Sequence, residues 1–151
     1  MKAEQFKYLQ PFFSKNENWG DIEKVPWHHV HMLFMIRKAM AECGFDWPMI
    51  IHCCHKTDGH SENSYHYKGL ATDFHFNISC PLLKQYSVFN DVLRILKLSR
   101  FVGMGVYPVK FPYSDYKGFF HIDSRGEYLR WIRVNDEYIY NDEKSIVEGI
   151  K

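Results

Sequence analysis

Apolar residues recur at steps of three and four positions in two stretches of the chain, and this spacing predicts two helices. The first covers about residues 25–42, with Pro26 and Gly44 suited to its two ends. The second opens at Pro81. Its apolar face, which we expect to turn towards the core, consists of Leu82, Leu83, Tyr86, Phe89, Val92, Leu93 and Leu96.

Short runs with the composition of β-strands lie between and after these helices. They cover residues 49–54, 70–76, 102–107, 119–124, 129–134 and 137–140. The last three runs follow each other too closely to need helical crossovers, which favours antiparallel pairing. The sequence therefore predicts an α+β fold, a mainly antiparallel sheet with helices packed on one side.

Side chains alternate between the two faces of a strand, so the pattern also assigns faces. Asp73 and His75 are expected on the same side of their strand as Ala71. His121 is expected on the same side of its strand as Phe119 and Asp123. Polar residues therefore share these faces with apolar ones.

Composition limits the classes of protein that the chain can belong to. With 151 residues, of which 46% are hydrophobic and 25% charged, it suits a single domain over residues 1–151, and it contains no repeat or linker. A net charge of +1 gives no electrostatic reason to expect nucleic acid as a partner. The first residues lack the apolar run of a signal peptide or membrane span. We expect a monomer that is cytoplasmic as synthesised, with no membrane partner.

The segment from Ser64 to Asp73 contains the most informative chemistry. His66 ends a polar loop, Gly69 lets the backbone turn, and Asp73 lies in the next strand, so an imidazole and a carboxylate can converge. His121 is the natural third ligand. Two imidazoles and one carboxylate leave Zn²⁺ with an open position for water, which is typical of catalytic sites. The alternative is that Asp73 is satisfied by hydrogen bonds and that the two histidines are unrelated.

These residues carry a resemblance to a known family. Ser64, His66, Gly69, Ala71 and Asp73 match the Ser-x-His-x-x-Gly-x-Ala-x-Asp signature of the zinc D-Ala-D-Ala carboxypeptidases, which share their fold with the hedgehog signalling domain. Residues 103–108 and 118–123, followed by the Arg-Trp pair at 130–131, resemble the Gly-x-Gly-x-Tyr-Pro and Phe-x-His-x-Asp blocks of a bacterial and phage branch of that family. Together the blocks span roughly residues 50–131.

The resemblance implies a zinc peptidase that acts on the peptide stems of peptidoglycan. It implies His66, Asp73 and His121 as the metal ligands. Activities in the family include trimming a terminal D-alanine and cutting within stems or crosslinks, and the motifs leave this choice open. Phage endolysins of the family commonly lack a signal peptide and reach the cell wall after release, which agrees with this N-terminal sequence.

The sequence differs from the family pattern at the positions where members carry the general base. Many members place a Glu or Asp three residues before the last ligand, or a His two residues before it, but here these positions hold Gly118 and Phe119. Asp115 is the first choice to fill the role, because it has the spacing of the hedgehog domain's active-site Glu. His60, which matches a hedgehog-domain histidine, is the second choice and can polarise water or hold an oxyanion. A solvated loop position is the alternative interpretation of Asp115 and His60.

The residues expected to bind substrate also differ from the family pattern. Family members often carry an Arg at the end of a Ser-Gly-Tyr-Arg run, and here His55 occupies that position with Lys56 beside it. Either can supply positive charge, although neither has the planar two-pronged grip of Arg. Tyr107 is expected to contact substrate because it belongs to the Gly-x-Gly-x-Tyr-Pro block. Ser64 is expected to hydrogen-bond substrate or loop backbone.

The sequence also sets expectations for other residues of these types. Cys53 and Cys54 are expected to be packed, reduced thiols, because a disulfide between neighbouring residues is strained. Asp123 is expected to orient a ligand histidine or to pair with Arg125. Three histidines near the start of the first predicted helix are expected at the surface: His28, His29 and His31.

A function from a different class fits the same residues. In this alternative the chain is a zinc-binding structural or recognition module of a phage or bacterium. The metal would hold loops in place, and the protein would have no peptidase activity. The missing acid or base near His121 supports it. Both functions imply about one zinc per chain, so turnover of stem peptides separates them.

Overall fold

A single mixed sheet organises the protein. The computed structural model describes residues 1–108 and 118–151, and within these ranges six strands follow the order β1-β2-β4-β3-β5-β6. Neighbouring strands pair antiparallel, except that β3 and β5 run parallel. The strands are β1 (Met49–Cys53), β2 (Ala71–Phe76), β3 (Gly103–Tyr107), β4 (Phe119–Asp123), β5 (Leu129–Val134) and β6 (Glu137–Tyr140). The predicted α+β class and mainly antiparallel sheet are therefore confirmed.

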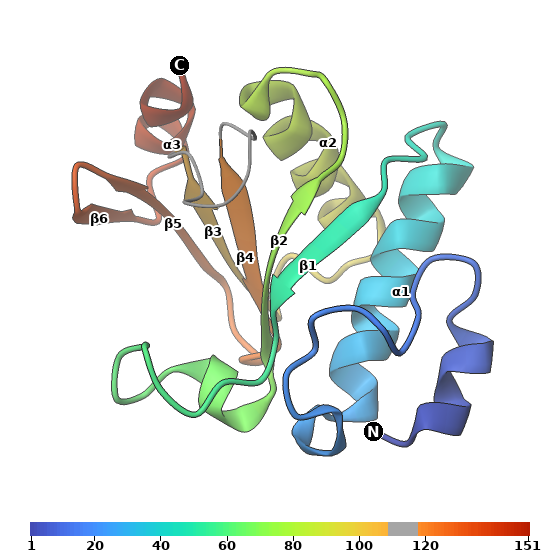
Figure 1. The fold of residues 1–151 in the computed structure, drawn as a ribbon. Helices are drawn as coiled ribbons and strands as arrows, with labels where there is room; N and C mark the ends of the chain where they lie inside the picture. Colours follow the sequence, from blue (N-terminus) through green and yellow to red (C-terminus); the bar gives the residue numbers. More distant parts are fainter. Residues whose placement is uncertain (109–117) are drawn as a thin grey trace.

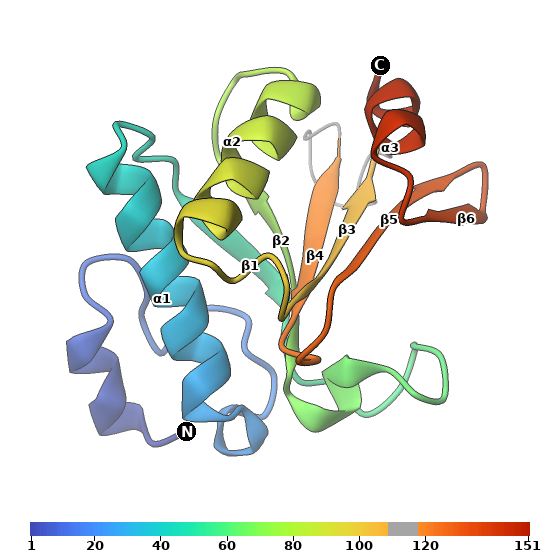
Figure 2. The ribbon, with the colours of Figure 1, turned by 180° about the vertical axis from the view of Figure 1, so that it is seen from behind.

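The α-helices lie together on one face of this sheet (Figures 1 and 2). The described elements include α1 (Trp27–Glu42), α2 (Leu82–Ile95) and α3 (Glu143–Ile150), with short 3-10 helices η1 (Ala3–Tyr8), η2 (Ile22–Lys24) and η3 (Tyr65–Lys68). Both predicted helices are confirmed, whereas α3 had no counterpart in the sequence prediction. None of the described helices combines the length and the apolar character needed to cross a membrane.

Aromatic residues fill the space between the helices and the sheet. Phe74 and Phe76 of β2, Phe89 of α2 and Phe120 of β4 are fully or almost fully buried, with neighbouring ring centroids 5.3–5.8 Å apart. Burying one such side chain contributes about 1.5–3 kcal/mol. The alternate residues of β2 and β4 that face the helices therefore form the centre of the core.

The opposite face of the sheet carries polar and aromatic side chains. Asp73 on β2, Phe119 and His121 on β4, and Trp131 and Arg133 on β5 all line a cleft on this face. The face assignment made from strand alternation is confirmed for Asp73 and His121, since their core-facing neighbours are buried beneath the helices. This second face positions the candidate site.

Candidate metal centre

The loop before β2 holds His66 in a defined orientation. Ser64 caps η3, because its side chain accepts a hydrogen bond from the backbone N–H of His66. Gly69 ends η3 with a φ of +64°, and a Cβ there would collide with the carbonyl oxygen of Lys24. Ser64 therefore contacts loop backbone, which is one of the two roles expected for it.

The orientation of the His66 ring follows from its partner. Nδ1 of the buried imidazole lies 2.7 Å from the carbonyl oxygen of Cys54. A carbonyl oxygen only accepts hydrogen bonds, so Nδ1 donates to it. This contact directs Nε2 to Asp73, whose Oδ2 lies 3.3 Å from Nε2.

Strand pairing brings the other two predicted ligands together. Asp73 of β2 and His121 of β4 are register partners in adjacent antiparallel strands. Directly opposite residues have Cβ atoms about 4.5–5.5 Å apart, so their side chains meet on the shared face. Nδ1 of His121 lies 2.8 Å from Oδ1 of Asp73 and 3.3 Å from Nε2 of His66.

A buried carboxylate orients the His121 ring. Nε2 of His121 donates to Oδ2 of Asp123 at 3.0 Å, which leaves Nδ1 directed at Asp73. Arg125 holds Asp123 with Nε and Nη2 at 2.7 and 2.6 Å. Both predicted roles of Asp123 are thus present. Burial disfavours the charged form of His121, but its hydrogen bonds to Asp123 and Asp73 outweigh burial and raise its pKa to about 9.

The three donor groups fit a small divalent cation. Zinc in a tetrahedral site has bonds of about 2.0–2.1 Å to nitrogen and oxygen, so its ligand atoms lie about 3.3 Å apart. The separations among His66 Nε2, Asp73 Oδ1 or Oδ2 and His121 Nδ1 are 2.8–3.3 Å. Two imidazoles and one carboxylate also match the donor types that zinc binds. The structure therefore brings together all three residues that the sequence predicted as ligands.

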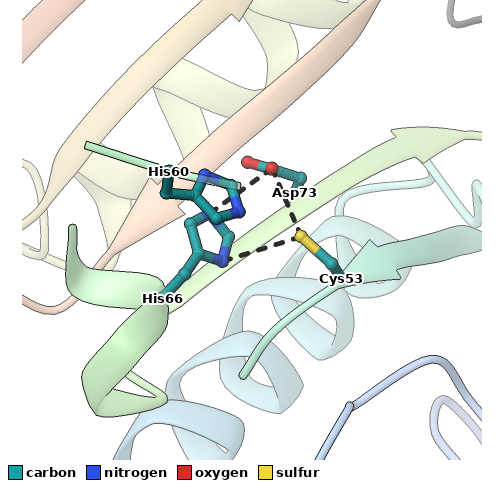
Figure 3. A group of neighbouring side chains, drawn as sticks. All are labelled: Cys53, His60, His66 and Asp73. Carbon is teal, nitrogen blue, oxygen red and sulfur yellow. Dashed lines mark hydrogen bonds and ion pairs between the residues drawn. The ribbon is translucent and has the colours of Figure 1, made fainter. Parts of the chain in front are cut away.

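A second group of donors overlaps the first (Figure 3). Cys53, His60, His66 and Asp73 have ligand atoms within 4.8 Å of one another and can hold a metal ion. The Cys53 thiol donates to Oδ2 of Asp73 at 3.4 Å, and its Sγ lies 3.7 Å from Nδ1 of His66. The His60 ring stacks on the His66 ring with centroids 4.3 Å apart. Cys53 is thus a candidate ligand that the sequence interpretation missed.

Cys53 reaches the centre through the pairing of β1 with β2. A register irregularity between Ile51 and Cys53 sets Cys53 opposite Asp73. Burial, and next the charge of Asp73, raise the pKa of its thiol well above the ordinary value. The expectation of packed, reduced thiols is confirmed, because Cys53 and Cys54 are both buried and free. The contact between Cys53 and Asp73 could not be predicted without knowing that β1 pairs with β2.

The Gly-x-Gly run of β3 accommodates large groups on the same face. A Cβ on Gly105 would collide with the indole of Trp131, and a Cβ on Gly103 would lie 2.5 Å from Nε of Arg125. The Trp131 indole therefore lies against β3, where its centroid is 5.1 Å from the His121 ring. Trp131 also donates from Nε1 to the hydroxyl of Tyr107 at 3.1 Å.

The donor groups open into a cleft of about 740 Å³. Of the residues expected to act on substrate, His60, Ser64 and Tyr107 line this cleft. Neither His55 nor Lys56 is among the described residues that line it. His55 is buried, and its backbone N–H donates to the carbonyl oxygen of Trp19. Asp115 lies outside the described residues.

One expectation about the histidines was wrong. His28 and His31 are exposed as expected, but His29 is fully buried. Its Nδ1 lies 2.5 Å from Ser124 Oγ, and its Nε2 lies 2.8 Å from Thr72 Oγ1. Burial lowers the pKa of His29 to about 3. The signal was available in the sequence, because His29 precedes the buried apolar face of α1 at helical spacing: Leu33, Ile36 and Met40.

The comparisons leave the fold family open. No protein-family model, curated protein or solved structure matches this chain. The resemblance to the zinc carboxypeptidases therefore rests on the motif residues.

Proposed function

We propose that the protein is a zinc-dependent peptidase that hydrolyses an amide bond in peptidoglycan stem peptides. The observation that carries this proposal is the meeting of His66 Nε2, the Asp73 carboxylate and His121 Nδ1 within 2.8–3.3 Å. The cleft at this point has a volume of about 740 Å³, which is within the range of ligand-binding sites. The motif resemblance supplies the substrate class, peptide stems ending in D-alanine.

The donor set defines what each residue contributes. His66, Asp73 and His121 would hold Zn²⁺, which supplies Lewis acidity to polarise a carbonyl and make water nucleophilic at neutral pH. Asp123 and Arg125 keep the His121 ring in its ligand orientation. His60 lies on His66 at the cleft and is the described residue that we propose for proton transfer. Asp115, the first choice from the sequence, stays a prediction.

A second candidate function follows from Cys53. Its thiol lies 3.4 Å from Asp73, so the chain also offers a group of four donors that includes sulfur. Four protein ligands make a closed structural zinc site, which leaves no position for water. This arrangement favours a non-catalytic zinc-binding module.

Turnover of defined stem peptides separates the two functions. The zinc-loaded protein is incubated with muropeptides, and mass spectrometry identifies the products. We expect release of D-alanine or of stem fragments, loss of turnover with a chelator, and recovery with zinc. His121→Gln should be inactive, whereas His31→Gln, at an exposed position of α1, should match the wild type. One bound zinc without cleavage of any stem bond would refute the peptidase proposal and leave the structural module.

A further inference from the structure

Two guanidinium groups line the cleft, and they differ in how their donors are used. Nε and Nη2 of Arg125 both donate to the fully buried carboxylate of Asp123. The same guanidinium lies over the rings of Tyr65 and Trp131, 5.1 and 5.4 Å from their centroids. Arg125 is therefore held in place as the support of Asp123 and His121.

Arg133 keeps an unused donor at the same cleft. Its Nε is buried and has no hydrogen-bond partner among the described residues, while Nη2 pairs with Asp136 at 2.7 Å. The Asp136 side chain is 89% exposed, so water and salt screen this ion pair. The guanidinium also lies 5.5 Å over the ring of Tyr138. Arg133 thus combines a desolvated N–H with a partner that an incoming anion can replace.

The position of Arg133 on β5 places it in the same cleft as the candidate metal centre. Trp131 and Arg133 are two residues apart on one strand, so they share a face and their Cα atoms are separated by about 6.5–7 Å. The Trp131 ring is itself 5.1 Å from the His121 ring. A ligand that contacts the donor groups and extends along β5 is therefore directed towards Arg133.

We infer that Arg133 forms a carboxylate-binding subsite, which recognises the terminal carboxylate of a stem peptide that lies in the cleft along β5. A planar guanidinium binds a carboxylate with two parallel N–H···O bonds, and Nε with one Nη can form that pair. His55 and Lys56, the sequence candidates for this charge, are not among the described residues that line the cleft. The inference rests on the proposed peptidase function and adds to it a preference for stem peptides with a free C-terminal carboxylate.

Matched substrates test this subsite. One is a synthetic stem pentapeptide ending in D-Ala-D-Ala with a free carboxylate, and the other is the same peptide with a C-terminal carboxamide. Because hydrogen bonds to charged groups are worth about 1.5–3 kcal/mol, we expect the wild-type kcat/KM to favour the carboxylate by about tenfold or more, mainly through KM. Arg133→Gln should lose this preference, and Arg133→Lys should keep only part of it.

The controls separate the subsite from general effects. Arg94→Gln changes an exposed arginine of α2 that pairs with Asp91 and Glu143, so it should keep the wild-type preference. Asp136→Asn removes the competing carboxylate while leaving the core untouched, so it should lower KM for the carboxylate peptide only. This variant tests the subsite even if Arg133→Gln fails to fold.

A binding measurement is independent of turnover. In nitrogen-15 NMR spectra of the metal-free protein, the Arg133 Nε–H signal, assigned by its loss in Arg133→Lys, should shift when N-acetyl-D-alanine is added and not when its amide is added. If the wild type cleaves both pentapeptides equally well, or if Arg133→Gln keeps the preference, the subsite is wrong while the peptidase function stands. Cleavage of neither peptide, nor of any other stem bond, would refute the peptidase function and the subsite with it.

Discussion

The two faces of the sheet differ in chemistry and in role, although residues that are adjacent in the sequence alternate between them. On β2, Phe74 turns to the helices and is fully buried, whereas Asp73 turns to the cleft and contacts His66 and His121. On β4, Phe120 and His121 divide in the same way. Hydrophobic packing on one face therefore gives the other face a rigid frame, on which polar groups can be placed at fixed separations.

The largest expected effect comes from the cleft face. Asp73→Asn keeps the shape of the side chain but removes the charge that joins His66 and His121. We expect zinc affinity to fall by at least about 100-fold, since even outer-shell changes cost about 10–100-fold. Competition with a chromophoric chelator measures this affinity, and circular dichroism checks that the fold is kept. Wild-type affinity in Asp73→Asn would show that this carboxylate is not a ligand.

The neighbouring substitution on the other face should have the opposite profile. Phe74→Ala removes a fully buried ring that packs against Phe76, Phe89 and Phe120. We expect the free energy of unfolding in urea to fall by about 3–5 kcal/mol. The folded fraction should still bind one zinc per chain. Loss of zinc from folded Phe74→Ala would mean that the two faces are not separable.

A smaller effect is expected where a bulky group rests on the sheet. Gly105→Ala places a methyl group where it would overlap the Trp131 indole, so the ring must move away from its position beside His121. We expect a loss of about 1–3 kcal/mol in unfolding free energy. In a Trp131→Ala background the same change should cost far less, and a double-mutant cycle measures the coupling. Equal costs in both backgrounds would contradict this contact.

A pH-dependent effect comes from the buried histidine of α1. Burial lowers the pKa of His29 to about 3, so the folded protein keeps it neutral while the unfolded chain takes up a proton near pH 6.5. The stability that it contributes is complete above pH 6.5 and is lost as the pH falls towards 3. We expect a slope of up to about 1.4 kcal/mol per pH unit, absent in His29→Gln. Urea unfolding between pH 4 and 7, with both proteins compared, measures the difference; parallel curves would contradict the assignment.

The sequence predicted the elements and faces better than it predicted individual contacts. Strand and helix positions follow from periodicities of two and of three to four residues, so the predicted and observed elements differ only by one or two residues at their ends. The three proposed ligands also meet as expected. The helix α3 was missed because its eight residues are too few for the helical spacing of Ile146, Val147 and Ile150 to stand out as a pattern.

The contacts that sequence alone left hidden depend on which strands are neighbours. Cys53 approaches Asp73 only because β1 pairs with β2 through an irregular register. Arg133 reaches the cleft because β5 runs parallel to β3, a pairing that local patterns do not specify. His29 is the exception, since its helical spacing from Leu33 and Ile36 indicated burial.

X-ray absorption at the zinc edge of the loaded protein tests the central claim most directly, because it identifies the atoms around the metal. Coordination by His66, Asp73 and His121 predicts nitrogen and oxygen scatterers alone, at about 2.0–2.1 Å. A sulfur scatterer at about 2.3 Å would place Cys53 in the coordination shell and contradict this set of three ligands.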